Sequence, residues 1–192
     1  MNKTDSVEIV ERAAPIIAAM FLFSFLCFAL PPKLGAWGLT ILGTTANDRI
    51  NGSPTGDNIS SRAGDDIVTD PGGDNEIDTG PGVDMVNGSS GSDFIFLDSG
   101  DDAAGGGDGH DEIEGATGND ILRGEGGNDV LIGGPDEDTL EGGNGTDHLY
   151  GGAGPDSLNG GDGADYFNCG LGQDRVVDFN VVQGDTRAVN CE

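Results

Sequence analysis

An aspartate recurs every nine residues through most of this chain. Fifteen positions spaced by nine run from Asp48 to Asp174 without an insertion or deletion, and fourteen of them are Asp while one is Asn75. The residue two positions later is apolar at all fifteen, and glycine stands two positions earlier in twelve and five positions earlier in ten. A fixed short period of this kind indicates a repeat architecture in which each repeat is one small structural unit.

Each nine-residue repeat has room for one strand and one turn. A single inward apolar residue between two outward ones predicts a strand of about three residues. The remaining positions are rich in Gly, Asn and Asp, which tolerate tight turns and positive φ. Two repeats therefore make one flat coil, and we predict an all-β fold, a parallel β-roll (solenoid) with coils about 4.8 Å apart. The predicted core positions are Ile50, Ile59, Val68, Ile77, Val86, Ile95, Ala104, Ile113, Leu122, Leu131, Leu140, Leu149, Leu158, Phe167 and Val176.

The regular order of the residues outweighs a composition that is typical of disordered proteins. The 192 residues include 36 Gly, 35 Asp plus Glu and only 8 Lys plus Arg, which gives a formal net charge of −27. Such a chain ordinarily buries too little apolar surface to fold, but a disordered chain has no reason to keep a register. The acidity also excludes nucleic acid and anionic lipid surfaces as partners and favours small hard cations.

The amino-terminal segment is apolar. Residues 13–30 carry no charge. They fit a cleaved signal peptide, for which Cys27-Phe28-Ala29 is a weak cleavage site, or an uncleaved membrane anchor, which needs about twenty apolar residues. Both would carry the rest of the chain across a membrane, to the extracellular space or the cell surface. We assign residues 1–33 to a hydrophobic helix that is a signal peptide or anchor, 34–42 to a linker, 43–178 to the roll and 179–192 to a C-terminal cap.

Three cysteines are present. Cys27 lies in the apolar segment, which leaves Cys169 and Cys191 as the only plausible pair outside it. Two cysteines do not form a zinc-type cluster. In an oxidising compartment we expect a disulfide between them, and in a reducing one two free thiols.

Four hexapeptides fit the pattern G-G-x-G-x-D best. They are Gly106–Asp111, Gly142–Asp147, Gly151–Asp156 and Gly160–Asp165. In these and in the period around them, the sequence resembles the repeats-in-toxin, or haemolysin-type, nonapeptide family over about residues 43–178. The resemblance implies a parallel β-roll that binds Ca²⁺ ions between successive coils.

Calcium is the expected cofactor, in multiple copies. One buried apolar side chain per repeat contributes about 1.5–3 kcal/mol, whereas ordering the backbone costs about 1–2 kcal/mol per residue, so the metal-free roll should be unstable. Ca²⁺ prefers six to eight oxygen ligands, which Asp carboxylates and glycine carbonyls can provide, and a cation would sit between Asp residues eighteen apart. The expected side-chain ligands are Asp84, Asp93, Asp102, Asp111, Asp120, Asp129, Asp138, Asp147, Asp156 and Asp165. The glycines expected to belong to the metal sites, through their backbone carbonyls, are Gly106, Gly109, Gly115, Gly118, Gly124, Gly127, Gly133, Gly142, Gly145, Gly151, Gly154, Gly160 and Gly163.

These patterns predict an exported calcium-binding protein with a structural or surface role. Catalysis is not expected, because the only histidines, His110 and His148, stand at outward positions and the period accounts for the acidic pairs that a glycosidase would need. The alternatives are an accessory module of a calcium-dependent hydrolase or epimerase and an adhesion module. The expected partners are calcium ions, with membrane contact only through an uncleaved N-terminal segment; the residues do not identify a protein or glycan partner.

Overall fold

The computed structural model describes residues 7–11 and 38–191. The hydrophobic helix expected within residues 1–33 falls outside these ranges. Of that segment the structure describes only residues 7–11, which contain the short strand β1 (Glu8–Glu11). In the part of the chain that is described, no helix is long and apolar enough to cross a membrane. All regular elements there are strands.

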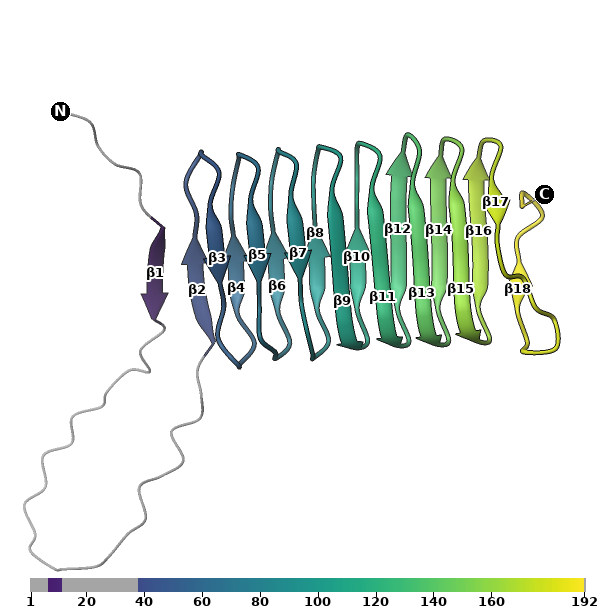
Figure 1. Cartoon of the computed structure of the whole chain (residues 1–192), viewed down its shortest axis with the longest axis horizontal. Helices are drawn as coiled ribbons and strands as arrows, with labels where there is room; N and C mark the ends of the chain where they lie inside the picture. The colour runs from purple at the N-terminus through teal and green to yellow at the C-terminus, as the bar shows by residue number, and fades with distance from the viewer. Residues whose placement is uncertain (1–6, 12–37, 192) are drawn as a thin grey trace, which may run out of the picture.

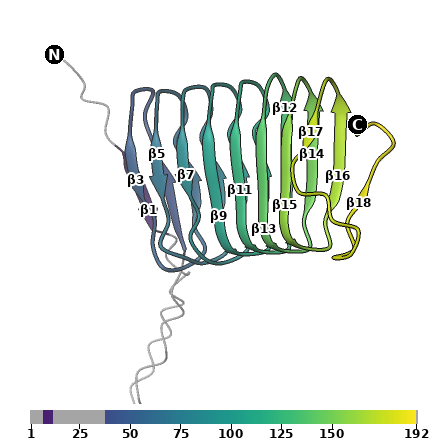
Figure 2. The same cartoon turned by 45° about the vertical axis from the view of Figure 1, so that its right-hand side comes forward.

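Two sheets form the opposite faces of a flattened coil (Figures 1 and 2). The sheet of ten strands contains β1, β2 (Leu39–Leu42), β4 (Asn58–Ser60), β6 (Glu76–Asp78), β8 (Phe94–Phe96), β10 (Glu112–Glu114), β12 (Val130–Pro135), β14 (His148–Ala153), β16 (Tyr166–Leu171) and β18 (Thr186–Arg187). The sheet of eight strands contains β3 (Arg49–Asn51), β5 (Ile67–Thr69), β7 (Met85–Asn87), β9 (Ala103–Gly109), β11 (Ile121–Gly127), β13 (Thr139–Gly145), β15 (Ser157–Gly163) and β17 (Arg175–Val176).

Neighbouring strands in each sheet are parallel and offset by two repeats. Leu122 pairs with Leu140 in one sheet and Ile113 pairs with Leu131 in the other. Only β1 runs antiparallel to its neighbour β2. The parallel β-solenoid and its two repeats per coil are confirmed, with about eight coils.

The core is a single column of apolar side chains between the sheets. The inward residues from Ile50 to Phe167 are buried as predicted, whereas Val176 in the last coil is only partly buried. The column begins earlier than expected, because β2 lies within the presumed linker at residues 34–42 and its Ile41 is 1% exposed. Pairing of β2 with β4 makes this segment the first coil of the roll.

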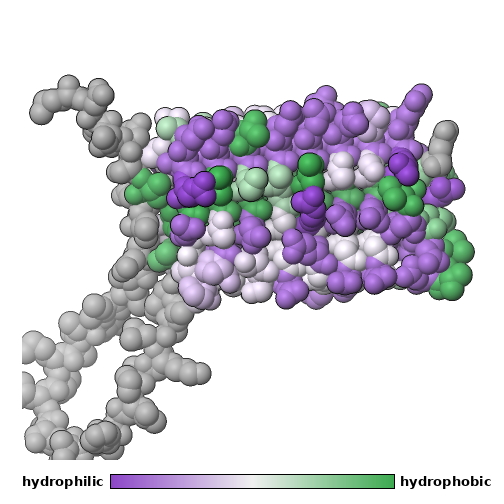
Figure 3. Space-filling view, viewed as in Figure 1, coloured by the Kyte–Doolittle hydropathy of each residue, from purple (hydrophilic) through white to green (hydrophobic). Residues whose placement is uncertain are grey.

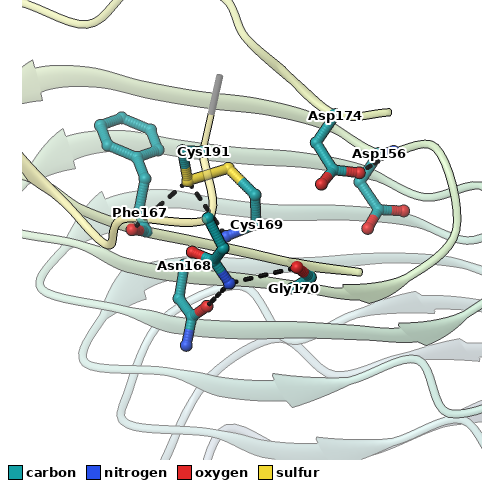
Figure 4. Close-up of a disulfide and its surroundings, with 8 residues drawn as sticks. Asp156, Phe167, Asn168, Cys169, Gly170, Asp174 and Cys191 are labelled. Atoms are coloured by element: carbon teal, nitrogen blue, oxygen red, sulfur yellow. Dashed lines mark hydrogen bonds between the residues drawn. A yellow bond between two sulfur atoms is a disulfide. The ribbon is translucent and has the colours of Figure 1, made fainter. Parts of the chain in front are cut away.

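The last residues cover the C-terminal end of the roll. A disulfide joins Cys169 to Cys191 across a Cα–Cα distance of 5.2 Å (Figure 4). The ring of Phe179 packs edge-on against Phe167 with centroids 6.2 Å apart, and the Arg187 guanidinium lies 5.0 Å from the Phe179 ring centroid. These contacts shield Phe167, whose side chain would be exposed at the end of an uncapped solenoid.

The turns form two edges along the roll. We call the loops that lead from the eight-stranded sheet to the ten-stranded sheet the Asp129 edge, and those that lead back the Asp120 edge. Successive loops on one edge are eighteen residues apart, so the recurring positions alternate between the edges; eight of the fourteen Asp residues lie on the Asp120 edge and six on the Asp129 edge, which also carries Asn75. Figure 3 shows hydrophilic side chains along the upper edge of the roll.

Candidate metal centre

The recurring aspartates link each coil to the next. The backbone N–H of Asp111 donates to Oδ1 of Asp129 at 2.9 Å, and on the other edge the N–H of Asp120 donates to Oδ1 of Asp138 at 2.9 Å. The structure joins in this way, at N–O distances of 2.7–3.0 Å, the eight pairs expected from the spacing: Asp84/Asp102, Asp93/Asp111, Asp102/Asp120, Asp111/Asp129, Asp120/Asp138, Asp129/Asp147, Asp138/Asp156 and Asp147/Asp165.

The second oxygen of these carboxylates has no hydrogen-bond partner. Oδ2 is buried and unpaired in every one of the ten expected ligands, and also in Asp66 and Asp70. The residues are 0–2% exposed. A buried acceptor without a partner costs about 1–3 kcal/mol, and more when it is charged. A regular series of such atoms indicates that each faces a proton or a cation in the functional state.

The electrostatics point the same way. Burial raises the pKa of Asp102, Asp111 and Asp138 to about 7, although a backbone N–H donated to each carboxylate acts in the opposite direction. Carboxylates on the neighbouring coils contribute to this rise. For the same main reason the pKa values of Asp93 and Asp147 rise to about 6. The roll therefore accommodates these charges poorly unless a positive ion accompanies them.

A glycine stands beside each unpaired oxygen in the regular repeats. A Cβ added to Gly124 would meet Oδ2 of Asp129 and would lie 2.6 Å from the carbonyl oxygen of Gly142 on the next coil. We call this space, beside the glycine five positions before the aspartate, a cradle. Eight cradles combine such a glycine with an unpaired Oδ2: Gly88/Asp93, Gly106/Asp111, Gly115/Asp120, Gly124/Asp129, Gly133/Asp138, Gly142/Asp147, Gly151/Asp156 and Gly160/Asp165.

The donors at a cradle fit Ca²⁺. They are a carboxylate oxygen and, in most cradles, a backbone carbonyl oxygen of the next coil, which are hard ligands suited to Ca²⁺ rather than to a thiolate- or imidazole-binding metal. Within residues 7–11 and 38–191, no three His, Cys, Asp or Glu side chains come close enough to hold a metal ion by themselves. Backbone carbonyls must therefore complete any such site, and they fit the flexible coordination of Ca²⁺.

The other expected glycines serve the stacking of coils. A Cβ on Gly127, whose φ is +136°, would collide with the carbonyl oxygen of Gly109 on the preceding coil. Gly109, Gly118, Gly145, Gly154 and Gly163 approach a carbonyl oxygen of the preceding coil in the same manner. Asp136, which replaces this glycine in one repeat, adopts φ +85°, so the turn keeps its course at the cost of local strain.

Side chains take the place of the cradle in part of the Asp120 edge. Ser61, Thr79 and Leu97 stand five positions before Asp66, Asp84 and Asp102, and all three are 0% exposed. The Ser61 hydroxyl donates to the carbonyl oxygen of Thr79 at 3.0 Å, and that of Thr79 to the carbonyl oxygen of Leu97 at 3.0 Å. In the glycine repeats the corresponding carbonyl oxygen borders a cradle.

The sequence patterns did not single out two features of this arrangement. The Gly88 cradle beside Asp93 was not among the expected glycines, although glycine five positions before an aspartate marks it. The buried hydroxyl side chains of Ser61 and Thr79 at the equivalent positions were not predicted, because in the sequence they appear only as gaps in the glycine pattern. The two histidines make contacts within the roll: Nδ1 of His110 accepts the N–H of Asn128 at 2.9 Å, and the His148 ring packs edge-on against Tyr166.

Comparison with protein families agrees with this geometry. The model of the RTX calcium-binding nonapeptide repeat matches the chain four times, at residues 40–69, 72–103, 105–140 and 141–176. No curated protein is similar enough to the chain to count as a match. The four matches cover well over half of the 192 residues, and they coincide with the coils that carry the recurring aspartates. The chain belongs to the RTX calcium-binding nonapeptide repeat family.

Proposed function

We propose that this protein is an exported structural or surface protein whose roll binds Ca²⁺ in its cradles and folds as it does so. The observation that carries the proposal is the regular series of buried, unpaired Asp Oδ2 atoms, eight of which lie beside a glycine. Ca²⁺ in a cradle would supply the missing partner of that oxygen and neutralise the repulsion between coils.

The proposed sites are the eight glycine cradles. In each, the ligands would be Oδ2 of the aspartate and the carbonyl oxygens of the glycine-rich turns. Asp84 and Asp102, which the spacing alone places among the ligands, are left out because Thr79 and Leu97 stand where their glycine would be. The proposal thus assigns five sites to the Asp129 edge and three to the Asp120 edge.

Folding is expected to depend on the ions. Without them, each cradle holds an unsatisfied buried acceptor, which costs about 1–3 kcal/mol. A ligand that binds only the folded state stabilises it by about 2.7 kcal/mol at one hundred times its dissociation constant. Several such sites acting together would convert an unstable roll into a stable one, as in other proteins whose metal binding and folding are coupled.

Export is supported by two features of the chain. Residues 13–30 form an uncharged apolar stretch of the kind that directs a chain across a membrane. The Cys169–Cys191 disulfide is typical of oxidising compartments and would add about 3 kcal/mol in the chain-entropy model. We propose a secreted or membrane-anchored location, where calcium is abundant, and no catalytic activity of the chain's own.

A calcium titration of the full-length chain tests the proposal. Circular dichroism should show much less strand signal in chelator than in millimolar Ca²⁺. Calorimetry should count about eight ions in the cradles. An unchanged spectrum together with no heat of binding would overturn the proposal.

Two glycines in one strand provide a matched pair of variants. Neither Gly124 nor Gly126 has a positive φ, so alanine strains the backbone at neither position. The new methyl group of Gly124→Ala would enter the cradle against Asp129, whereas that of Gly126→Ala would lie 3.2 Å from the Asp108 side chain. We expect Gly124→Ala to bind one ion fewer and Gly126→Ala to bind the full number. Equal numbers in both variants would contradict the assignment of the cradle.

A further inference from the structure

The repeat that contains Asp70 and Asn75 carries its carboxylate at a different position from the other repeats. It stands five positions before Asn75, where the regular repeats carry glycine, and Asn75 stands where they carry aspartate. Oδ1 of Asn75 still accepts the N–H of Asp57 at 2.8 Å, as the aspartates do elsewhere. The amide nitrogen of Asn75 cannot bind a cation, so this repeat has lost its usual ligand oxygen and gained a carboxylate at another point.

The Asp70 carboxylate points toward the preceding coil on the same edge. Its Oδ2 is the atom closest to where a Cβ of Gly52 would lie, and Oδ2 of Asp57 is 2.8 Å from the same point. Asp70 is 0% exposed, and its Oδ2 has no hydrogen-bond partner. The other oxygen, Oδ1, accepts the N–H of Gly72 at 2.9 Å, which holds the side chain in this orientation.

We propose that Asp57 and Asp70 form a ninth cation site, specific for a hard divalent cation such as Ca²⁺. The ligand atoms of this site differ from those of the eight cradles. Two side-chain carboxylates from adjacent coils border the space beside Gly52, whereas the regular cradles there present one carboxylate and a backbone carbonyl. The added negative charge should give this site the higher affinity for Ca²⁺, since affinity rises with the number of charged ligands.

The two carboxylates differ in their partners: Oδ1 of Asp57 accepts the N–H of Leu39 and its Oδ2 accepts that of Ser53, whereas Oδ2 of Asp70 has no donor. The pKa of Asp70 is raised to about 7, mainly by burial, with a contribution from the nearby charges of Asp57 and Asp93. In the part of the chain that the structure describes, the single salt bridge between side chains, Arg123 to Glu141, lies elsewhere on the roll. Two buried carboxylates facing each other either share a proton or bind a metal ion.

This inference rests on the proposed function only in that the coils must stack for the two residues to meet. It is tested by counting the calcium ions bound to the full-length chain with equilibrium dialysis against radioactive Ca²⁺ over a range of free concentrations. The variants are Asp70→Asn, Asp57→Asn and the double variant. Asp78→Asn is the control, because it removes the same charge from an exposed side chain in β6, the next strand after Asp70 in the chain.

We expect Asp70→Asn to lose one ion, and the one bound at the lowest free Ca²⁺, while Asp78→Asn retains the full number. Asp57→Asn and the double variant should lose that same single ion and no other. If Asp70→Asn binds as many ions as the native chain, the carboxylates share a proton and the inference is overturned. If Asp57→Asn loses an ion but Asp70→Asn does not, the inference is also overturned, because Asp57 would then bind the ion without Asp70.

The outcome for the proposed function is separate. A native chain that binds no calcium refutes the eight cradles as well, whereas a native chain that binds several ions but is unaffected by Asp70→Asn refutes only the ninth site. Circular dichroism of each variant in saturating Ca²⁺ checks that the roll has formed. A variant that does not fold is replaced by Asp70→Ser, which also removes the carboxylate and for which the same loss of one ion is expected.

Discussion

The two halves of the roll share one topology but differ in what holds their coils together. In residues 39–100, from β2 to β8, most strands have three residues, and side chains such as Ser61 and Thr79 bind the next coil directly. In residues 103–171, from β9 to β16, all strands except β10 have six or seven residues because the glycine turns join the pairing. Figure 1 shows the longer arrows toward the C-terminal end. Seven of the eight cradles lie in this second half.

The difference shows two solutions to one problem. A parallel coil with one inward residue per repeat needs additional contacts between turns. Hydroxyl side chains and Leu97 provide them in the first half and leave little room for an ion, whereas glycine in the second half leaves that room. We therefore expect the second half to depend on calcium more strongly than the first.

Removal of calcium should produce the largest effect and should act unevenly. At a hundredfold excess over its dissociation constant, each ion stabilises the folded state by about 2.7 kcal/mol, so its removal should lower amide protection roughly a hundredfold around each cradle. We expect hydrogen exchange in chelator to accelerate most in residues 103–165 and least around Ser61 and Thr79. Uniform acceleration along the roll would show that the halves unfold as one unit.

A pair of identical substitutions sharpens the comparison at single sites. Asp129 and Asp66 both have an unpaired Oδ2, but Gly124 stands beside the first and Ser61 beside the second. Asparagine keeps the Oδ1 acceptor, as Asn75 shows. In saturating Ca²⁺ we expect Asp129→Asn to lower the free energy of unfolding by about 2–3 kcal/mol and Asp66→Asn to change it by less than about 0.5 kcal/mol. Denaturant titration measures both, and equal losses would contradict the distinction.

Acid should act in opposite directions on the metal-free and the calcium-loaded roll. Burial raises the pKa of Asp102, Asp111 and Asp138 from 3.8 to about 7, so between these values the metal-free folded state binds more protons than the unfolded chain. Its stability is greatest in acid and is lost as pH rises through about 7. In saturating Ca²⁺ the sign reverses, because protons compete with the ion for the same oxygens.

Circular dichroism at several pH values checks this reversal. In chelator we expect more strand signal at about pH 5 than at about pH 7.5, and in calcium a lower melting temperature at the more acid value. The C-terminal half, with most of the cradles, should account for most of both changes. The same direction of change in both conditions would rule out the aspartates as the shared binding groups.

The smallest expected effect concerns strain in a turn of the second half. Four positions before the aspartate the backbone takes a positive φ, and Gly107, Gly134, Gly143, Gly152 and Gly161 provide it in the second half. Ala116 adopts φ +70° at this position, a conformation that disfavours residues with a Cβ. We expect Ala116→Gly to raise the free energy of unfolding in Ca²⁺ by about 1 kcal/mol.

Ala153 is the matched control for that substitution, because it is exposed in β14 and has no positive φ. Glycine there should lower the free energy of unfolding by about 0.5–1 kcal/mol through the added freedom of the unfolded chain. Thermal denaturation of the two variants in saturating Ca²⁺ measures the contrast. A change of the same sign in both would show that the turn around Ala116 is not strained.

Much of the fold followed from local patterns. The nine-residue period predicted the parallel coils, the two repeats per coil and the inward residues from Ile50 to Phe167, because a strand's inward face and the tight turns both depend on residue types at fixed spacing. The period also predicted that aspartates eighteen apart would meet. It did not predict that β2 and Ile41 belong to the first coil, since that segment lacks the repeat's aspartate.

The register of the roll, its core and the two acidic edges follow from the nine-residue period alone, because each repeats at a fixed interval. The packing of the coils was needed to establish which aspartate faces a glycine and which faces a buried side chain. It also decided that the Asp70 carboxylate reaches the space beside Gly52. The physical reason is that a cradle is assembled from two coils, and its contents depend on the direction in which a side chain points and on the residue stacked eighteen positions away.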